Sequence, residues 1–208
     1  MLKRFRRLIL VNGCFALLLF THIVAASDKT ILVMGDSLSA GYGIDLQQSW
    51  VQQLQDKLSR EQRAYTVINA SVSGETTTGG AARLARLLQT HKPELVLLEL
   101  GGNDGLRGQP IKIMRSNLSQ MIEASRAINA KVVLVGIQIP PNYGARYAGA
   151  FANMFPALAQ AHDIALVPFL LEGVALNPEL MQSDGIHPVA EAQPLMLGNV
   201  WPVLEPLL

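Results

Sequence analysis

Five short, continuous apolar runs are spread along the chain from residue 30 onward, and a longer segment separates each run from the next. Short apolar runs of this kind are typical of strands that are buried on both faces. They are Ile31–Met34, Val67–Ile68, Leu95–Leu98, Val132–Ile137 and Ile164–Val167. The pattern therefore predicts five strands.

The segments between these runs repeat apolar residues every three or four positions, which is typical of amphipathic helices. Their apolar faces are Trp50, Leu54 and Leu58; Leu84, Leu87 and Leu88, with Arg83 and Arg86 opposite; Ile111, Met114, Leu118 and Met121; and Tyr147, Phe151, Phe155 and Leu158. Alternating strands and helices predict a parallel sheet with helices on both faces, joined by right-handed crossovers. The expected fold is a three-layer α/β/α domain without an internal repeat or linker.

The C-terminal stretch from Val189 to Leu208 also has a helical pattern, but it contains three prolines and a glycine. These residues are expected to kink or shorten the helix, because proline lacks a backbone N–H and its ring clashes with the preceding turn. They are Pro194, Gly198, Pro202 and Pro206.

Composition narrows the class of protein further. The chain has 208 residues, of which 50% are hydrophobic and 16% charged, so a single globular domain is expected and intrinsic disorder is excluded. The formal net charge is +1, but it becomes −3 without residues 1–26, which hold four basic residues and no acidic one. No basic stripe remains to neutralise phosphates, so we expect no nucleic-acid partner.

The N-terminus has the pattern of a secretory signal peptide. Four basic residues precede an apolar run from Leu8 to Phe20, and small residues at Val24–Ala26 suit a cleavage site. We assign residues 1–26 to a signal peptide and 27–208 to the mature domain, which is expected to be periplasmic or secreted. An uncleaved anchor and a lipid-modified Cys14 are the alternatives. Since Cys14 is the only cysteine, the mature protein is expected to lack disulfides and a catalytic thiol.

Ligands of open α/β sheets bind beyond the carboxyl ends of the strands, so the loops that follow the strands are where function is expected. The first such loop is Gly35–Gly43, and it contains Ser37 as a candidate nucleophile; the alternative is that Ser37 only caps a turn. The fifth residue of this motif is Ser39 rather than glycine, which disfavours the G-x-S-x-G pattern of α/β-hydrolases. No lysine lies in the loop, which disfavours a phosphate-binding loop.

A serine nucleophile needs a base, and His187 is the candidate that has a partner nearby. Asp184 lies three residues before it and can orient the imidazole as a general base requires. The alternative is a turn followed by a helix that begins near Pro188. His91 and His162 lie at expected helix ends and are predicted to be solvated surface residues.

Acyl transfer also needs hydrogen-bond donors for the negative charge that develops on the carbonyl oxygen. Asn103 follows the third predicted strand and supplies a side-chain amide, and Gly74 follows the second and allows a backbone N–H to approach closely. Tight turns after the strands are the alternative interpretation of both.

Taken together, these blocks resemble the SGNH or GDSL-type serine hydrolases. The resemblance rests on Gly35–Ser39, Gly74, Gly101–Asp104 and Asp184–Pro188, and the 105–108 loop with Asn142–Gly144 is similar to members with thioesterase, lysophospholipase and arylesterase activity. It implies a flavodoxin-like, mostly parallel five-stranded sheet. It also implies Ser37 as nucleophile, His187 as base, Asp184 as its partner, and an oxyanion hole made by Ser37, Gly74 and Asn103. Such a hydrolase needs no metal and no cofactor.

The expected substrate is a small acyl ester or thioester with a medium to long acyl chain, bound by a monomer that contacts lipid transiently. Leu106, Ile139 and Tyr143 are the candidate substrate-binding residues, and with Leu38, Ile137 and Pro140 they line an apolar groove or belong to the core. Three alternatives stay open: a carbohydrate O-acetylesterase, a non-catalytic periplasmic binding module, and a metal site. The metal site would use Asp36, Asp104, Asp184 and His187.

Overall fold

The computed structural model describes residues 29–208, so the signal peptide predicted at residues 1–26 lies outside the described residues. Within residues 29–208, no helix combines the length and the apolar character needed to cross a bilayer. Five strands form one sheet in the order β2-β1-β3-β4-β5, and every neighbouring pair is parallel. The strands are β1 (Lys29–Gly35), β2 (Tyr65–Asn69), β3 (Leu95–Glu99), β4 (Lys131–Val135) and β5 (Ala165–Val167).

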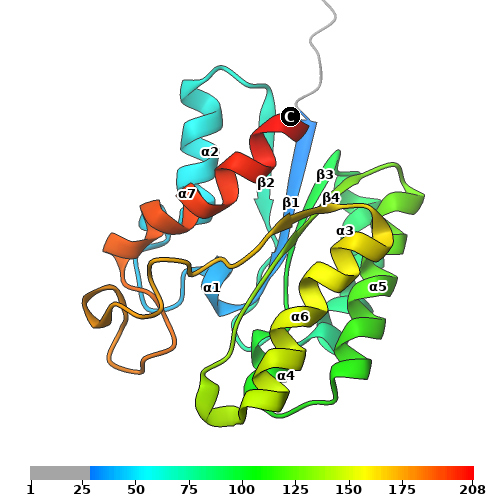
Figure 1. Ribbon diagram of the computed structural model, residues 1–208. Helices are drawn as coiled ribbons and strands as arrows, with labels where there is room; N and C mark the ends of the chain where they lie inside the picture. The colour runs from blue at the N-terminus through cyan, green and yellow to red at the C-terminus, as the bar shows by residue number, and fades with distance from the viewer. Residues whose placement is uncertain (1–28) are drawn as a thin grey trace, which may run out of the picture.

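Helices cover both faces of the sheet (Figure 1). One face is covered by α3, α5 and α6, and the other by α2 and α7, while the short helices α1 and α4 follow β1 and β3 directly. The helices are α1 (Ser37–Ala40), α2 (Trp50–Arg60), α3 (Thr77–His91), α4 (Gly102–Leu106), α5 (Ile111–Ala127), α6 (Ala145–His162) and α7 (Gln193–Leu204). The predicted three-layer α/β/α fold with a parallel five-stranded sheet is confirmed.

The core consists of two apolar clusters, one on each face of the sheet. In β1, Ile31 and Val33 face the cluster under α2 and α7, while Leu32 and Met34 face the cluster under α3, α5 and α6. All four side chains are fully buried, as the continuous apolar run predicted for a central strand. The prediction of burial on both faces is wrong for β2 and β5, whose residues are mostly half-buried because these strands form the edges of the sheet.

The prolines near the C-terminus disrupt the last helix less than predicted. Pro194 lies in the first turn of α7, where its missing N–H has no helical partner to lose, and the helix continues through Gly198 and Pro202 to Leu204. Only Pro206 falls outside, in a 3₁₀ turn over Glu205–Leu207. The helix is therefore shorter than the predicted stretch, but Pro202 does not end it.

The order of the strands determines where a ligand can bind. The chain adds β2 on one side of β1 and then crosses to the other side to add β3, β4 and β5, so the direction reverses between β1 and β3. A reversal of this kind opens a crevice beyond the carboxyl ends of the two strands. Ser37 follows β1 and Asn103 follows β3, so both residues lie at this crevice.

Replacement of Gly136 tests how closely the chain packs at the ends of β4 and β5. Its N–H donates to the Val167 carbonyl over 2.8 Å, and a Cβ built at this position collides with the backbone carbonyl of Pro168. Because backbone cannot move aside as a flexible side chain does, we expect Gly136→Ala to lower the free energy of unfolding by roughly 1 to 3 kcal/mol. Urea unfolding measures this change.

Gly149 is the matched control, because its replacement adds the same methyl group at an open position. It is exposed on α6, and a Cβ there meets nothing within 4 Å outside the helix backbone. We expect Gly149→Ala to raise the free energy of unfolding by up to about 1 kcal/mol, through the better helix propensity of alanine. Equal unfolding midpoints for the two variants would contradict the close packing at Gly136.

Candidate active site

The structure brings Ser37, Asp184 and His187 into one hydrogen-bonded chain. Ser37 Oγ lies 2.9 Å from His187 Nε2, and His187 Nδ1 lies 2.6 Å from Asp184 Oδ2. With Nδ1–H donating to the carboxylate, Nε2 is left to accept the proton of the serine hydroxyl. The arrangement is that of a nucleophile, a base and an orienting acid, although 150 residues separate Ser37 from His187 along the chain.

Local backbone structure fixes the position of Ser37. The chain leaves β1 through Asp36, whose side chain accepts a hydrogen bond from Leu38 N over 3.0 Å and so caps the short helix α1. Ser37 is the first residue of this helix, where the backbone N–H has no helical acceptor. The turn thus presents both the hydroxyl and the free N–H of Ser37 at the edge of the sheet.

A tight loop holds the imidazole and the carboxylate. Asp184 Oδ1 accepts hydrogen bonds from the backbone N–H groups of Ile186 and His187, at 2.9 and 3.0 Å. On the other side of the loop, Gln182 N donates to the His187 carbonyl over 2.7 Å. The hydrogen bond from the His187 ring is the main reason why the pKa of Asp184 is lowered to about 2, so this group is charged near neutral pH.

Two further contacts near His187 were not predicted from the sequence. The ring of Tyr42 lies 4.4 Å from the imidazole, centroid to centroid, and Gln182 Nε2 donates to the Tyr42 carbonyl over 2.9 Å. Gln182 thereby ties the loop of the base to the loop of the nucleophile. No spacing in the sequence signals a contact between residues 140 positions apart.

Asn103 lies between the two loops that carry Ser37 and Gly74. Its side-chain N–H₂ donates to Asp36 Oδ2 over 3.1 Å and to the Glu75 carbonyl over 3.0 Å, so it contacts the immediate neighbours of both residues. Gly74 has a φ of 79°, a left-handed conformation that favours glycine. Neither Ser37 N–H nor Gly74 N–H donates to an acceptor among residues 29–208. The predicted donors therefore gather at one site.

A pair of buried carboxyl groups lies directly behind the nucleophile. Asp36 is 2% exposed and Glu99 is fully buried, and Glu99 Oε2 accepts hydrogen bonds from Ser39 Oγ at 2.6 Å and from Asp36 N at 3.3 Å. Burial raises the pKa of Asp36 to about 6, and burial together with the Asp36 charge raises the pKa of Glu99 well above 4.5. A charged residue at the end of the apolar run Leu95–Leu98 was the available signal for Glu99.

A match between this chain and a family model identifies its family. Residues 33–193 match the model described as GDSL-like Lipase/Acylhydrolase family, and this range includes every residue of the hydrogen-bonded chain described above. The chain belongs to this family.

Named relatives align with nearly the whole length of this chain. It is 53% identical over 202 residues to Esterase TesA of Pseudomonas aeruginosa, covering 97% of this chain and 100% of the relative. It is 45% identical over 192 residues to Thioesterase 1/protease 1/lysophospholipase L1 of Escherichia coli K12, covering 92% and 90%. The crystal structure of esterase EstA from Pseudoalteromonas, inhibited by monoethylphosphonate, matches with a TM-score of 0.82 and 44% identity, covering 86% and 98%.

The candidate substrate-binding residues of this hydrolase differ in exposure. Tyr143 is 40% exposed and Leu106 is half-buried, whereas Ile139 is only 7% exposed and packs in the core under α3, α5 and α6. Leu38 and Ile137 are buried as well, at 8% and 4%. Tyr143, Leu106 and the exposed Pro140 therefore offer most of the accessible surface among the residues predicted to contact an acyl chain.

His91 and His162, the two other histidines among residues 29–208, differ from their prediction as solvated residues, because both are half-buried. His162 Nε2 lies 2.7 Å from Ser119 Oγ, which explains its partial burial. The four residues of the metal alternative have other partners: Asp104, for example, accepts hydrogen bonds from Thr77, and Asp184 binds His187. Among residues 29–208, no group of three or more His, Cys, Asp and Glu side chains is arranged to hold a metal ion.

The raised pKa of Asp36 predicts a loss of stability as the pH rises. A carboxyl group whose pKa is raised from 3.8 to about 6 binds its proton more tightly in the folded state, so its contribution is complete below pH 4 and is lost as the pH passes 6. We expect the free energy of unfolding to fall by roughly 2 to 3 kcal/mol between pH 4 and 7 on this account. Asp36→Asn is expected to reduce this fall, and the part that remains belongs to Glu99, whose pKa is raised in the same direction by burial. Urea unfolding at several pH values measures the change.

Asp184→Asn is the control, because the pKa of Asp184 is shifted in the opposite direction. A pKa lowered from 3.8 to about 2 contributes stability that is present above pH 4 and is lost only as the pH falls toward 2. The fall in the free energy of unfolding between pH 4 and 7 is therefore expected to persist in Asp184→Asn. A fall in Asp36→Asn as large as in the parent would show that Asp36 does not contribute to it.

Proposed function

We propose that the protein is a serine esterase and thioesterase that cleaves small acyl esters and thioesters through an acyl-enzyme on Ser37. One observation carries this proposal: Ser37 Oγ lies 2.9 Å from His187 Nε2, and Asp184 Oδ2 lies 2.6 Å from the other ring nitrogen. Membership of the GDSL-like lipase/acylhydrolase family supports the same reaction class. So do relatives whose names include esterase, thioesterase and lysophospholipase.

In the first half of the reaction, Ser37 Oγ attacks the carbonyl carbon while its proton passes to His187 Nε2. The carbonyl oxygen becomes an oxyanion, for which the free N–H groups of Ser37 and Gly74 are available donors. The Asn103 amide is the third donor. Because its two hydrogens already bind Asp36 and Glu75, the oxyanion has to share one of them.

Collapse of this intermediate breaks the bond to the leaving group. His187 returns its proton to the departing alkoxide or thiolate, and the acyl group stays on Ser37. In the second half, His187 takes a proton from water, the hydroxide attacks the acyl carbonyl, and the fatty acid leaves as Ser37 regains its proton. Asp184 stabilises the imidazolium in both halves, and its lowered pKa keeps it charged for this role.

The acyl chain is proposed to bind along Leu106, Ile139 and Tyr143, at the loops that follow β3 and β4. A panel of p-nitrophenyl esters from acetyl to palmitoyl, together with acyl-CoAs and lysophospholipids, tests the substrate class. We expect medium and long acyl chains to have a higher kcat/KM than acetyl. A strong preference for acetyl would contradict an acyl-chain site.

A carbohydrate O-acetylesterase is the second candidate, because two exposed tyrosines lie on loops at the active edge. Tyr42 is 52% exposed and Tyr143 is 40% exposed, and exposed aromatic rings stack on sugars. Acetylated xylan in the same panel distinguishes the two candidates. Faster release of acetate from this polymer than of long-chain acids from p-nitrophenyl esters would favour the second.

We also propose that residues 1–26 direct the protein to the periplasm or outside the cell and are then removed. The support is the basic start, the apolar run from Leu8 to Phe20 and the small residues at Val24–Ala26. The mature domain 27–208 is then expected to act as a monomer. N-terminal sequencing of the exported protein tests the cleavage, and a sequence that begins at Met1 would contradict it.

A further inference from the structure

Charge is distributed unevenly between the two helical layers, and one layer gathers basic residues although the sequence showed no basic stripe. The helices α3, α5 and α6 carry six basic residues and a single acidic one, Glu123. On the opposite face of the sheet, α2 carries two basic residues and one acidic residue, and α7 carries no charged residue. The six basic residues, which define what we call the basic face, are Arg83, Arg86, Lys112, Arg115, Arg126 and Arg146.

Most of these cations have no acidic partner among residues 29–208. Arg83 pairs with Glu75 over 2.6 Å, and it is the only one of the six that forms a salt bridge with any of residues 29–208. The other five side chains are exposed. In contrast, Lys57 on α2 of the opposite layer and Arg63, three residues after this helix ends, both pair with Glu61. The positive charge of the basic face is therefore available to an external anion.

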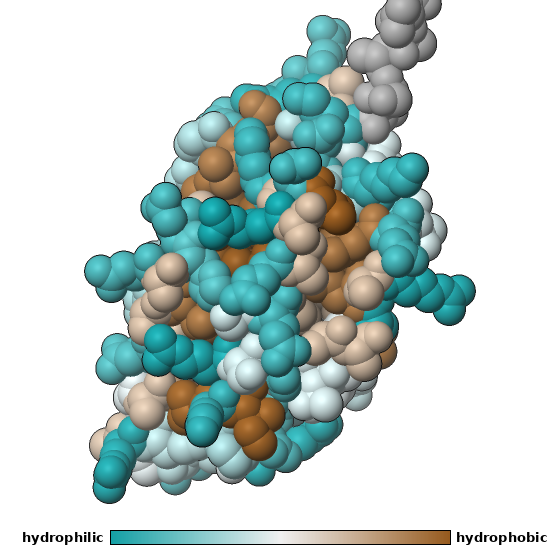
Figure 2. Space-filling view, turned by 90° about the vertical axis from the view of Figure 1, so that its right-hand side faces the viewer, coloured by the Kyte–Doolittle hydropathy of each residue, from teal (hydrophilic) through white to brown (hydrophobic). Residues whose placement is uncertain are grey.

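The same face also exposes apolar surface. A groove of about 650 Å³ between α3 and α5 is lined mostly by apolar side chains, together with Gln89 and Lys92. Ile113 on α5 and Ile128 directly after this helix are 46% and 42% exposed. Figure 2 views the molecule from the side of these helices, and it shows hydrophobic areas interrupted by hydrophilic side chains. Apolar surface and unpaired cations are thus mixed on one side of the molecule.

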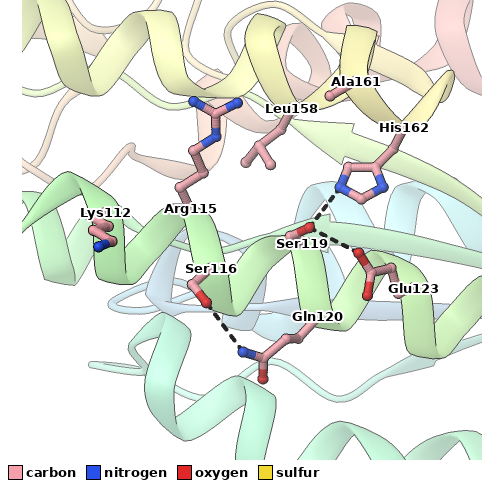
Figure 3. Close-up of a pocket in the computed structure, with 9 residues that line it drawn as sticks. All are labelled: Lys112, Arg115, Ser116, Ser119, Gln120, Glu123, Leu158, Ala161 and His162. Carbon is pink, nitrogen blue, oxygen red and sulfur yellow. Dashed lines mark hydrogen bonds between the residues drawn. The ribbon is translucent and has the colours of Figure 1, made fainter.

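A second groove, of about 450 Å³, lies between α5 and α6 (Figure 3). Lys112 and Arg115 line one end of it, and Ser119 joins His162 and Glu123 at the other. Leu158 forms part of its wall. The cations of this groove lie in the first two turns of α5, directly after the loops at the carboxyl edge of the sheet.

The basic face reaches the rim of the active site through Arg107. Its guanidinium donates to the carbonyl of Gly74 over 3.4 Å, and Gly74 is one of the proposed oxyanion donors. Both α5 and α6 begin at this edge, after the loops that follow β3 and β4. A surface that binds the basic face is therefore adjacent to the entrance of the site.

We propose that the basic face binds peripherally to the surface of a bilayer that contains anionic phospholipid. The unpaired cations attract the lipid phosphates, and the exposed isoleucines with the α3–α5 groove contact the acyl region, which is the combination that interfacial binding requires. Binding in this way would bring acyl substrates next to the active site, and this advantage for catalysis rests on the proposed function. The binding to the bilayer does not depend on the proposed function.

Vesicle co-sedimentation of the Ser37→Ala protein without residues 1–26, whose basic start and apolar run would themselves bind anionic vesicles, tests the proposal without any turnover of lipid. We expect binding to phosphatidylcholine vesicles with one third phosphatidylglycerol to be at least tenfold tighter than to phosphatidylcholine alone, and to weaken as salt is added. Lys112→Gln/Arg115→Gln in this background is expected to weaken binding to the anionic vesicles roughly tenfold. Ile113→Ser/Ile128→Ser is expected to weaken the binding that remains at high salt.

Lys57→Gln/Arg60→Gln is the matched control, because it removes one lysine and one arginine from α2 on the opposite layer. It changes the net charge equally, and we expect its binding to stay within twofold of the parent. Equal losses in the two charge variants, or no preference for anionic vesicles, would overturn the proposal. So would a change in oligomeric state of Lys112→Gln/Arg115→Gln with unchanged vesicle binding, which would assign the face to self-association. Since binding is measured on an inactive protein, none of these results bears on the esterase proposal.

Discussion

Replacement of Ser37 by alanine is expected to lower kcat for ester hydrolysis by about 10⁴-fold or more. The variant keeps the imidazole and the donors of the oxyanion, but it has no oxygen to form the acyl-enzyme. The methyl side chain fits the first position of α1, so the free energy of unfolding is expected to change little. Steady-state kinetics on a p-nitrophenyl ester, together with urea unfolding, measures both effects.

Ser59→Ala is the control for this variant. Ser59 is exposed near the end of α2, and its hydroxyl bonds only within that helix, to Gln55. Its activity is expected to equal that of the parent. Turnover by Ser37→Ala at a rate near that of Ser59→Ala would show that another group carries the acyl transfer.

Asn103→Ala is expected to lower kcat by about 10²- to 10³-fold, because one preorganised donor of the oxyanion is lost. KM is expected to change much less, since the charge on the oxygen develops only in the transition state. The buried Asp36 also loses a hydrogen bond from Asn103, so the variant is expected to be less stable as well. Kinetics at a temperature well below the midpoint of unfolding separates the two effects.

Asn117→Ala provides a matched loss of a side-chain amide away from the site. Its N–H₂ donates to Thr77 Oγ1 and Thr78 Oγ1 at 3.1 and 3.0 Å, so the substitution likewise removes two hydrogen bonds. We expect a loss of stability with nearly unchanged kcat. If Asn103→Ala and Asn117→Ala reduced kcat equally, the effect of Asn103 would be structural rather than electrostatic.

The sequence pattern was sufficient to predict the centre of the fold, because β1, β3 and β4 are buried on both faces and therefore appear as continuous apolar runs. It was less informative at the edges. The β2 run was predicted as Val67–Ile68, but the strand extends over Tyr65–Asn69 because hydrogen bonds to β1 continue beyond the apolar residues. The last helix was predicted to be kinked or shortened by its prolines, whereas α7 places one in its first turn and accommodates another near its end.

At the site, the residues with a chemical signature were recognisable from sequence. Ser37, Asp184 and His187 lie in short motifs where residue type and spacing suggest a nucleophile and its base. Residues that act through tertiary contacts carried weaker signals: Glu99 contacts Ser39 sixty positions away, and the tilted contact between the Tyr42 and His187 rings depends on the fold of two distant loops. Such contacts depend on how the chain folds rather than on local spacing.

The proposed catalysis depends above all on proton transfer from the Ser37 hydroxyl to the His187 imidazole. A fluorophosphonate tests this transfer directly, because such reagents react with activated serines. Mass spectrometry of the treated protein is expected to find one adduct on the peptide that contains Ser37. No adduct is expected in Ser37→Ala, and labelling of His187→Ala is expected to be at least about 100-fold slower, since the general base is lost. Labelling of another residue, or labelling of His187→Ala at the rate of the parent, would contradict the account.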